Sequence, residues 1–270
     1  VIGNQSKNFS VGANLAMILM EAEDDNTFEL DAVVNAFQQG TLRMKYSKKP
    51  VVAAPYNMTL GGGAEVCLAA AHIQASAETY MGLVEVGVGV IPGGGGNKEL
   101  YMKQLKGLPK GVNIDLLNIV SKTFETIATA KTSMSAEEAR DNNFLNFADG
   151  ISVNPDHLLY DAKQAVIGLV AEGYQAPTRE KVPVVGETGY AALLLGAEGL
   201  KNSGFASTYD LEIAKKLAYV LAGGLVPYGT LVDEQYLLDL EREAFISLVQ
   251  NAATQQRMQH MLLKGKPLRN

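Results

Sequence analysis

The hydrophobic positions in the first half of the chain predict short buried strands joined by helices. Residues 51–54 form an apolar run after residues 48–50, which are Lys-Lys-Pro, and such a run is typical of a buried strand. Residues 55–63 predict a turn-rich loop, residues 64–71 a short helix, and residues 73–76 a second strand. This order of elements indicates an α/β fold with a crossover connection.

Helical periodicity flanks these strands. Residues 29–45 predict an amphipathic helix, and residues 100–105 and 114–130 predict two more. Ser135 is followed three residues later by Glu138, a capping-box pattern that opens a helix reaching about residue 142. In the first of these helices the apolar side chains lie on or near one face: Leu30, Val33, Val34, Phe37 and Leu42.

The pattern changes after about residue 154, where one helical segment follows another to the end of the chain. We therefore divide the chain into an α/β segment, residues 1–155, and an α-helical C-terminal region, residues 156–270. The helices expected in the second segment cover residues 157–173, 190–201, 208–222, 233–250 and 254–263, with a proline-containing loop at 175–187.

Glycine is the first compositional feature that points to chemistry. The chain has 27 glycines in 270 residues, above the usual share of ~7%, and the excess lies between residues 61 and 96. Residues 61–63, Gly-Gly-Gly, stand between the first strand and the first helix. Glycine lets the backbone approach a ligand, and the unpaired N–H groups at a helix start favour an oxyanion. For three glycines taken alone, a tight turn that needs glycine only for packing is the more common explanation.

Two carboxylates accompany the glycines. Glu65 lies one short turn into the helix, and Glu85 directly precedes the glycine-dense residues 87–96. A solvated loop charge is the simpler explanation of Glu85, and a second acid or base beside Glu65 is the alternative. The chain has no Gly-x-Gly-x-x-Gly, Walker A or Gly-x-Ser-x-Gly motif, so nucleotide-binding and serine-nucleophile interpretations fail.

Charge and composition exclude several other classes. The net charge of −6 and the lack of a basic stripe argue against nucleic acid. A single cysteine allows no internal disulfide and fits a reducing, cytoplasmic location. The three histidines are far apart, so no zinc spacing exists and we expect no metal. No apolar stretch is long enough for a membrane span, and we expect no signal peptide.

Five segments, taken together in order and spacing, resemble the crotonase (enoyl-CoA hydratase/isomerase) superfamily. The likeness covers roughly residues 9–155 and continues through Ser135-Ala-Glu-Glu-Ala139. The segments are Phe9-Ser-Val-Gly-Ala-Asn14, Lys49-Pro-Val-Val-Ala-Ala54, Leu60-Gly-Gly-Gly-Ala-Glu65, Gly82-Leu-Val-Glu85 and Ile91-Pro-Gly-Gly-Gly-Gly96.

The resemblance implies a ClpP/crotonase-like ββα fold and a reaction on an acyl-CoA thioester. By position, the N–H groups of Ala13 and Gly62 would hold the thioester oxygen, and Glu65 and Glu85 would flank the water that adds to the double bond. Isomerases and hydrolases of the superfamily generally lack one of these acids, so hydratase is favoured. The substrate contacts implied by the same motifs are Val11, Leu15 and Gly61.

The chain departs from the family pattern in three ways. Asn14 stands where the family usually has Asp, and Asn57 where it tends to have Gly, but Asn can cap a helix and tolerates left-handed geometry. Only eight residues precede the Phe9 motif, where a complete crotonase domain has several strands. We therefore expect a partial fold, with low activity of the isolated chain or self-association over the exposed sheet edge.

The C-terminal region resembles the tail of bacterial two-activity β-oxidation proteins, in which a 3-hydroxyacyl-CoA dehydrogenase portion precedes the hydratase. The likeness rests on residues 209–219 and 239–245. It implies an excised C-terminal part of a longer chain, with NAD bound only by the dehydrogenase portion and no cofactor here. The expected partners are a covalently linked dehydrogenase domain or further copies of the chain. Three alternatives stay open: an isomerase, a thioester hydrolase, or a non-catalytic scaffold for the dehydrogenase.

Overall fold

Two small parallel sheets lie at the centre of the α/β segment in the computed structural model, which describes residues 1–106 and 114–270. One sheet has the order β1 (Val52–Ala53), β3 (His72–Ser76) and β5 (Gly150–Ser152), and the other pairs β2 (Asn57–Leu60) with β4 (Thr79–Gly82). All of these pairings are parallel. The α/β class and the strands expected at residues 51–54 and 73–76 are therefore confirmed.

The residues before the first helix run along the outer edges of both sheets. Ile2 exchanges backbone hydrogen bonds with Val52 and Ala54, both 2.8 Å, beside β1. Ser10 does the same beside β2, accepting from Leu60 N at 2.9 Å and donating to Met58 O at 3.1 Å. These bonds cover part of the edge that the sequence predicted to be exposed.

The expected loop at residues 55–63 is partly wrong, because residues 57–60 form β2. Its sequence, Asn-Met-Thr-Leu, lacks a run of apolar residues, and its extended form comes from pairing with β4, which the sequence also did not indicate. Asn57 does have the left-handed conformation expected of it, with φ of 46°. Strand formation here is decided by a partner about twenty residues away, which local patterns do not record.

Five helices of the first segment were expected close to where they lie, whereas the helix at residues 15–23 and the 3₁₀ turn at residues 85–88 were not. The helices are α1 (Leu15–Glu23), α2 (Thr27–Lys45), α3 (Gly62–Ala69), α4 (Gly96–Leu105), α5 (Leu116–Ala128) and α6 (Ala136–Asp141), together with the 3₁₀ turn η1 (Glu85–Val88). Asn14 caps α1 by accepting hydrogen bonds from Ala16 N and Met17 N, and Ser135 caps α6 by accepting from Glu138 N.

The expected face of α2 is partly wrong. Val33 is 57% exposed, whereas Gln38 and Lys45 are buried. Gln38 Nε2 donates to Gly93 O at 2.9 Å and to Leu238 O at 3.0 Å, and it thereby supplies hydrogen-bond donors to two buried backbone carbonyl groups. The buried side of α2 is therefore set both by apolar residues such as Leu30 and Leu42 and by polar partners on other elements.

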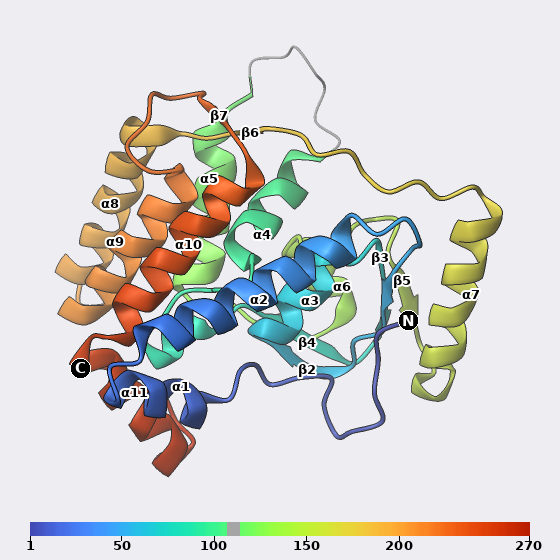
Figure 1. Ribbon diagram of the computed structural model, residues 1–270, viewed down its shortest axis with the longest axis horizontal. Coiled ribbons are helices and arrows are strands. Elements are labelled where there is room, and N and C mark those ends of the chain that lie inside the picture. Colours follow the sequence, from blue (N-terminus) through green and yellow to red (C-terminus); the bar gives the residue numbers. More distant parts are fainter. Residues whose placement is uncertain (107–113) are drawn as a thin grey trace.

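The second segment is almost wholly helical. Its elements are η2 (Pro155–His157), α7 (Leu158–Ala171), β6 (Val182–Pro183), α8 (Gly186–Asn202), α9 (Thr208–Ala222), β7 (Leu231–Val232), α10 (Glu234–Val249) and α11 (Ala252–Lys264). Figure 1 shows α7 beside the β1–β3–β5 sheet, while α8 to α11 stand on the opposite side of the molecule. Within the described residues, no helix is long and apolar enough to cross a membrane.

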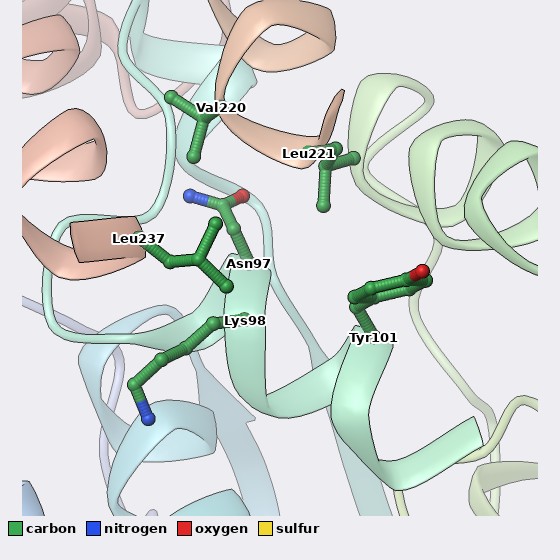
Figure 2. A pocket seen from close by; sticks show the side chains of 6 residues that line it. All are labelled: Asn97, Lys98, Tyr101, Val220, Leu221 and Leu237. Atoms are coloured by element: carbon green, nitrogen blue, oxygen red, sulfur yellow. The ribbon is translucent and has the colours of Figure 1, made fainter. Parts of the chain in front are cut away.

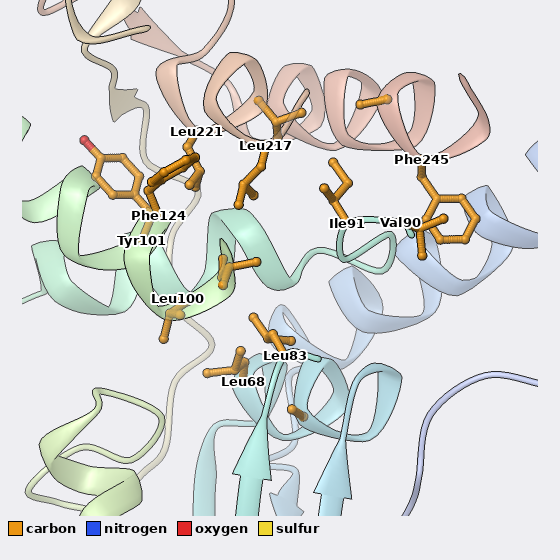
Figure 3. Close-up of a cluster of buried hydrophobic side chains, with 14 of the residues drawn as sticks. Leu68, Leu83, Val90, Ile91, Leu100, Tyr101, Phe124, Leu217, Leu221 and Phe245 are labelled. Carbon is orange, nitrogen blue, oxygen red and sulfur yellow. The ribbon is translucent and has the colours of Figure 1, made fainter. Parts of the chain in front are cut away.

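One apolar core joins the two segments. It contains Leu68 of α3, Leu100 of α4, Leu217 of α9 and Phe245 of α10, and Figure 3 shows the buried side chains that these elements contribute. Leu83 and Ile91, on the connection between β4 and α4, fill its centre and are fully buried. The C-terminal helices therefore pack directly on the glycine-dense loop, while the boundary at residue 155 stays a prediction.

Candidate active site

The three glycines between β2 and α3 bring two distant segments into contact. Gly61, which precedes α3, has a φ of 55°, and Gly12 has a φ of 101°. Residues other than glycine rarely adopt such positive φ angles. A Cβ atom at Gly12 would lie 4.0 Å from Gly61 Cα, and one at Gly63 would lie 2.5 Å from Ser10 Cβ. The glycines therefore allow residues 10–13 to lie directly against residues 60–63.

This contact brings together the two residues expected to supply backbone N–H groups. The amides of Ala13 and Gly62 have no hydrogen-bond partner among the described residues. Gly62 is the first residue of α3, where helix amides are unpaired and the helix dipole is positive. Two unpaired amides on adjacent segments can bind an oxygen that gains negative charge.

Glu65 is held inside the protein by the glycine-dense loop. Its side chain accepts hydrogen bonds at Oε1 from Gly94 N and Gly96 N, both at 2.8 Å, and the residue is 3% exposed. Burial raises the pKa of Glu65 to about 7, although the two amides and the Lys98 charge lower it. The carboxyl group is thus poised to take up or release a proton near neutral pH.

Glu85 lies against the start of α3. A Cβ atom at Gly61 would be 3.3 Å from Glu85 Oε1. Both carboxyl oxygens of Glu85 are buried and accept no well-formed hydrogen bond among the described residues. Burial, followed by the nearby charge of Glu65, raises the pKa of Glu85 well above its ordinary value, although the nearby backbone amides of Glu85 and Val84 lower it. A buried acid without a partner in the protein is suited to contact a water or a ligand.

The two carboxyl groups therefore gather at the amino-terminal end of α3. The pKa of Glu85 responds to the charge of Glu65, and a Cβ atom at Gly62 would lie 3.9 Å from Glu65 Oε2. Two buried acids this close do not both ionise readily, so they titrate as a pair with one proton retained. The structure brings together four residues named from sequence, namely Gly61, Gly62, Glu65 and Glu85.

The other two expected substrate contacts are placed differently. Val11 is 63% exposed next to Gly12, whereas Leu15, the first residue of α1, packs against the apolar core. The roles of these residues, like those of the two amides and two acids, stay predictions.

Sequence reasoning missed two neighbours of the site. The ring of Phe37 on α2 lies over the glycines: a Cβ atom at Gly62 would be 3.6 Å from its Cζ, and one at Gly94 only 2.1 Å from its Cε1. Glu241 on α10 binds the loop next to Glu65. From the sequence, Phe37 was assigned to a helix face and Glu241 to the helix at residues 233–250, and neither pattern signals proximity to residues 61–65.

A cavity of about 10 Å³ lies on the far side of α4 and is lined by Asn97, Lys98, Tyr101, Val220, Leu221 and Leu237. Figure 2 shows these side chains, which come from α4, α9 and α10. The volume suffices for about one water molecule, and Asn97 Oδ1 is buried without a partner among the described residues. This cavity is too small for a substrate.

Comparison with solved structures shows the fold. A carnitinyl-CoA dehydratase from Mycobacterium thermoresistibile superposes with a TM-score of 0.63 at 15% identity, covering 98% of this chain and 75% of that one. An enoyl-CoA hydratase from Bacillus halodurans gives 0.59 at 20% identity, covering 94% and 79%. The chain has the crotonase fold, followed by a helical C-terminal region, as expected.

Three relatives found by sequence show which kinds of protein this chain is similar to. The "Probable 3-hydroxyacyl-CoA dehydrogenase" of Bacillus subtilis is 65% identical over all 270 residues, which are 34% of that protein. A short-chain-enoyl-CoA hydratase of Clostridium acetobutylicum is 30% identical over 48% of this chain and 53% of its own length. A fatty acid oxidation complex subunit alpha of Shewanella frigidimarina is 26% identical, covering 66% of this chain and 28% of the relative. No protein-family model matches.

The chain thus spans about a third of the first relative, and its sequence likeness is to fatty-acid oxidation proteins that carry hydratase and dehydrogenase names.

Proposed function

We propose that this chain is the enoyl-CoA hydratase part of a longer fatty-acid β-oxidation protein and adds water to trans-2-enoyl-CoA. The observation that carries the proposal is the pair of buried carboxyl groups, Glu65 and Glu85, beside the unpaired amides of Ala13 and Gly62. Hydration of a conjugated thioester needs a base for water, a proton for C2 and a site for the enolate charge. These four residues offer all three.

The pKa values indicate which carboxyl group acts as the base and which as the acid. Glu65, with a pKa of about 7 and two amide donors, is the better base, and it takes a proton from water as the hydroxyl adds to C3. Glu85 has no partner and a strongly raised pKa, so it donates its proton to C2. Transfer of the proton from Glu65 back to Glu85 restores the starting state. Meanwhile the amides of Ala13 and Gly62 hold the thioester oxygen.

The activity of the rest of the longer protein is inferred only from its resemblance to known proteins. We assign NAD binding and the oxidation of the 3-hydroxy product to a dehydrogenase part outside these residues, in keeping with the name of the Bacillus subtilis relative.

The test measures hydration of trans-2-butenoyl-CoA by the wild-type chain, Glu85→Gln and the exposed control Glu172→Gln. We expect Glu85→Gln to lower turnover roughly 10²–10⁴-fold, because general acid catalysis is lost, while binding of acetoacetyl-CoA persists. Unchanged turnover in Glu85→Gln would refute the role. A wild-type chain that neither hydrates the substrate nor binds acetoacetyl-CoA contradicts the whole proposal, and preferential double-bond migration with a 3-enoyl-CoA favours an isomerase.

A further inference from the structure

Four successive amides at the end of the glycine-dense loop donate to two carboxylates that are far apart in sequence. Gly94 N and Gly96 N donate to Glu65 Oε1, both at 2.8 Å. Gly95 N donates to Glu241 Oε1, and Asn97 N donates to Glu241 Oε2 at 3.2 Å. The loop is thus held from one side by α3 and from the other by α10.

The local backbone explains why this loop can be held from both sides. Gly95 is the N-cap of α4 with φ of 107°, and the first amides of a helix have no partner within it. The side chain of Asn97 adds a bond from Nδ2 to Glu241 Oε2 at 2.8 Å. Glu241 is 1% exposed, so its carboxyl group serves this loop and not the solvent.

We infer that Glu241 is a positioning residue, which fixes the loop so that the amides of Gly94 and Gly96 aim at Glu65. The inference rests on the proposed hydratase function and extends it to the C-terminal helical region. In this arrangement α10 does more than cover the core, because it supplies one of the two carboxyl groups that order the active-site loop.

The charge of Glu241 adds a second effect on the same site. Burial, then the charge of Glu65, raises the pKa of Glu241 to about 8, while the loop donors and Lys98 lower it. The Glu241 charge in turn helps to raise the pKa of Glu85. Removing that charge should therefore lower the pKa of Glu85 and move the alkaline limb of the pH–rate profile to lower pH.

Other charged groups near α10 face elsewhere. Among the described residues, those that bear on Glu241 are Glu65, Glu85 and Lys98. The groups of α2 that reach α10 are Asp31, which pairs with Arg242, and Lys45, which pairs with Glu234. For the charged residues of α1, α9 and α11, no contact with Glu241 is found within the described ranges.

The experiment compares Glu241→Gln and Glu241→Asp with the exposed control Glu243→Gln on the same helix. For Glu241→Gln we expect kcat for hydration to fall roughly 10- to 100-fold because the loop is misplaced, with KM little changed and the alkaline limb of the profile shifted to lower pH. Glu241→Asp keeps the charge but shortens the reach, so kcat falls without the pH shift. The control matches wild type.

The outcomes separate this inference from the proposed function. If wild type hydrates the substrate and both Glu241 variants keep its kcat and pH profile, the inference is overturned while the function stands. If wild type does not hydrate, the function fails, and carboxyl NMR titration of Glu65 decides the inference instead. The Gly94 and Gly96 amides lower the Glu65 pKa, so a Glu65 pKa that is higher in Glu241→Gln supports the inference, and an unchanged or lower value overturns it. If Glu241→Gln does not fold, Glu241→Asp and Asn97→Ala replace it. Their kcat and their Glu65 pKa then decide the inference by the same criteria.

Discussion

Replacing Glu65 by Gln should make the protein more stable at neutral pH while it removes activity. The substitution keeps the shape of the side chain and leaves an oxygen that can accept from Gly94 N and Gly96 N. It removes only a buried ionisable group. The gain arises because the wild-type carboxyl group is costly to ionise inside the protein.

The magnitude follows from the pKa of Glu65, which burial raises from 4.5 to about 7. Between these values the folded state binds more protons than the unfolded state, so wild-type stability falls as pH rises through this window. Because one pKa unit corresponds to about 1.4 kcal/mol, the loss is about 3 kcal/mol above pH 7. Below pH 4.5 both states are protonated and the loss vanishes.

Urea unfolding at several pH values between 5 and 8 measures this difference by linear extrapolation. The free energy of unfolding of Glu65→Gln, relative to wild type, should rise across this range by most of the ~3 kcal/mol. The exposed control Glu172→Gln should show no such rise. An equal difference at pH 5 and pH 8, or a variant less stable than wild type at pH 8, would contradict the reasoning.

Two further changes test how the site is built. Gly94→Ala should lower the hydration rate, and it should lower the free energy of unfolding by about 1–3 kcal/mol, because the new Cβ would lie 2.1 Å from Phe37 Cε1. Hydration assays and urea midpoints measure the two effects. A variant that behaves like wild type contradicts the prediction. Lys45→Met should cost roughly 1–3 kcal/mol. Lys45 Nζ lies 3.0 Å from Glu99 and 2.9 Å from Glu234 with all three side chains buried, and Lys98 Nζ still pairs with both carboxyl groups. The double variant with Glu99→Gln should recover part of that loss in thermal unfolding, and a double variant as unstable as the sum of both single changes would argue against the pairing.

Local patterns predicted the features that depend on neighbouring residues. The hydroxyl and amide caps at Ser135 and Asn14 were recognisable because their partners lie two or three residues away. The helix at 208–222 was predicted with its correct bounds, since its apolar periodicity and the glycines after it are both local. The spacing of the glycines with Glu65 and Glu85 indicated the candidate site by resemblance.

Features that depend on distant partners were missed or misassigned. Strands β2 and β4 are extended because they pair with each other, and Gln38 is buried because it bonds to backbone at residues 93 and 238. The sequence offers no signal for either pairing, since the partners are separated by tens to hundreds of residues. Glu241 was missed for the same reason.

The sequence by itself determined which groups could do chemistry: the glycines that let two chain segments touch, the amides after them and the two acids at family spacing. Only the tertiary structure decided the state of those acids. Their pKa values are set by burial and by each other's charge, and burial arises from α10 and the apolar core packing on the loop. Desolvation depends on everything that excludes water around a group, so it becomes defined only when the whole chain has folded.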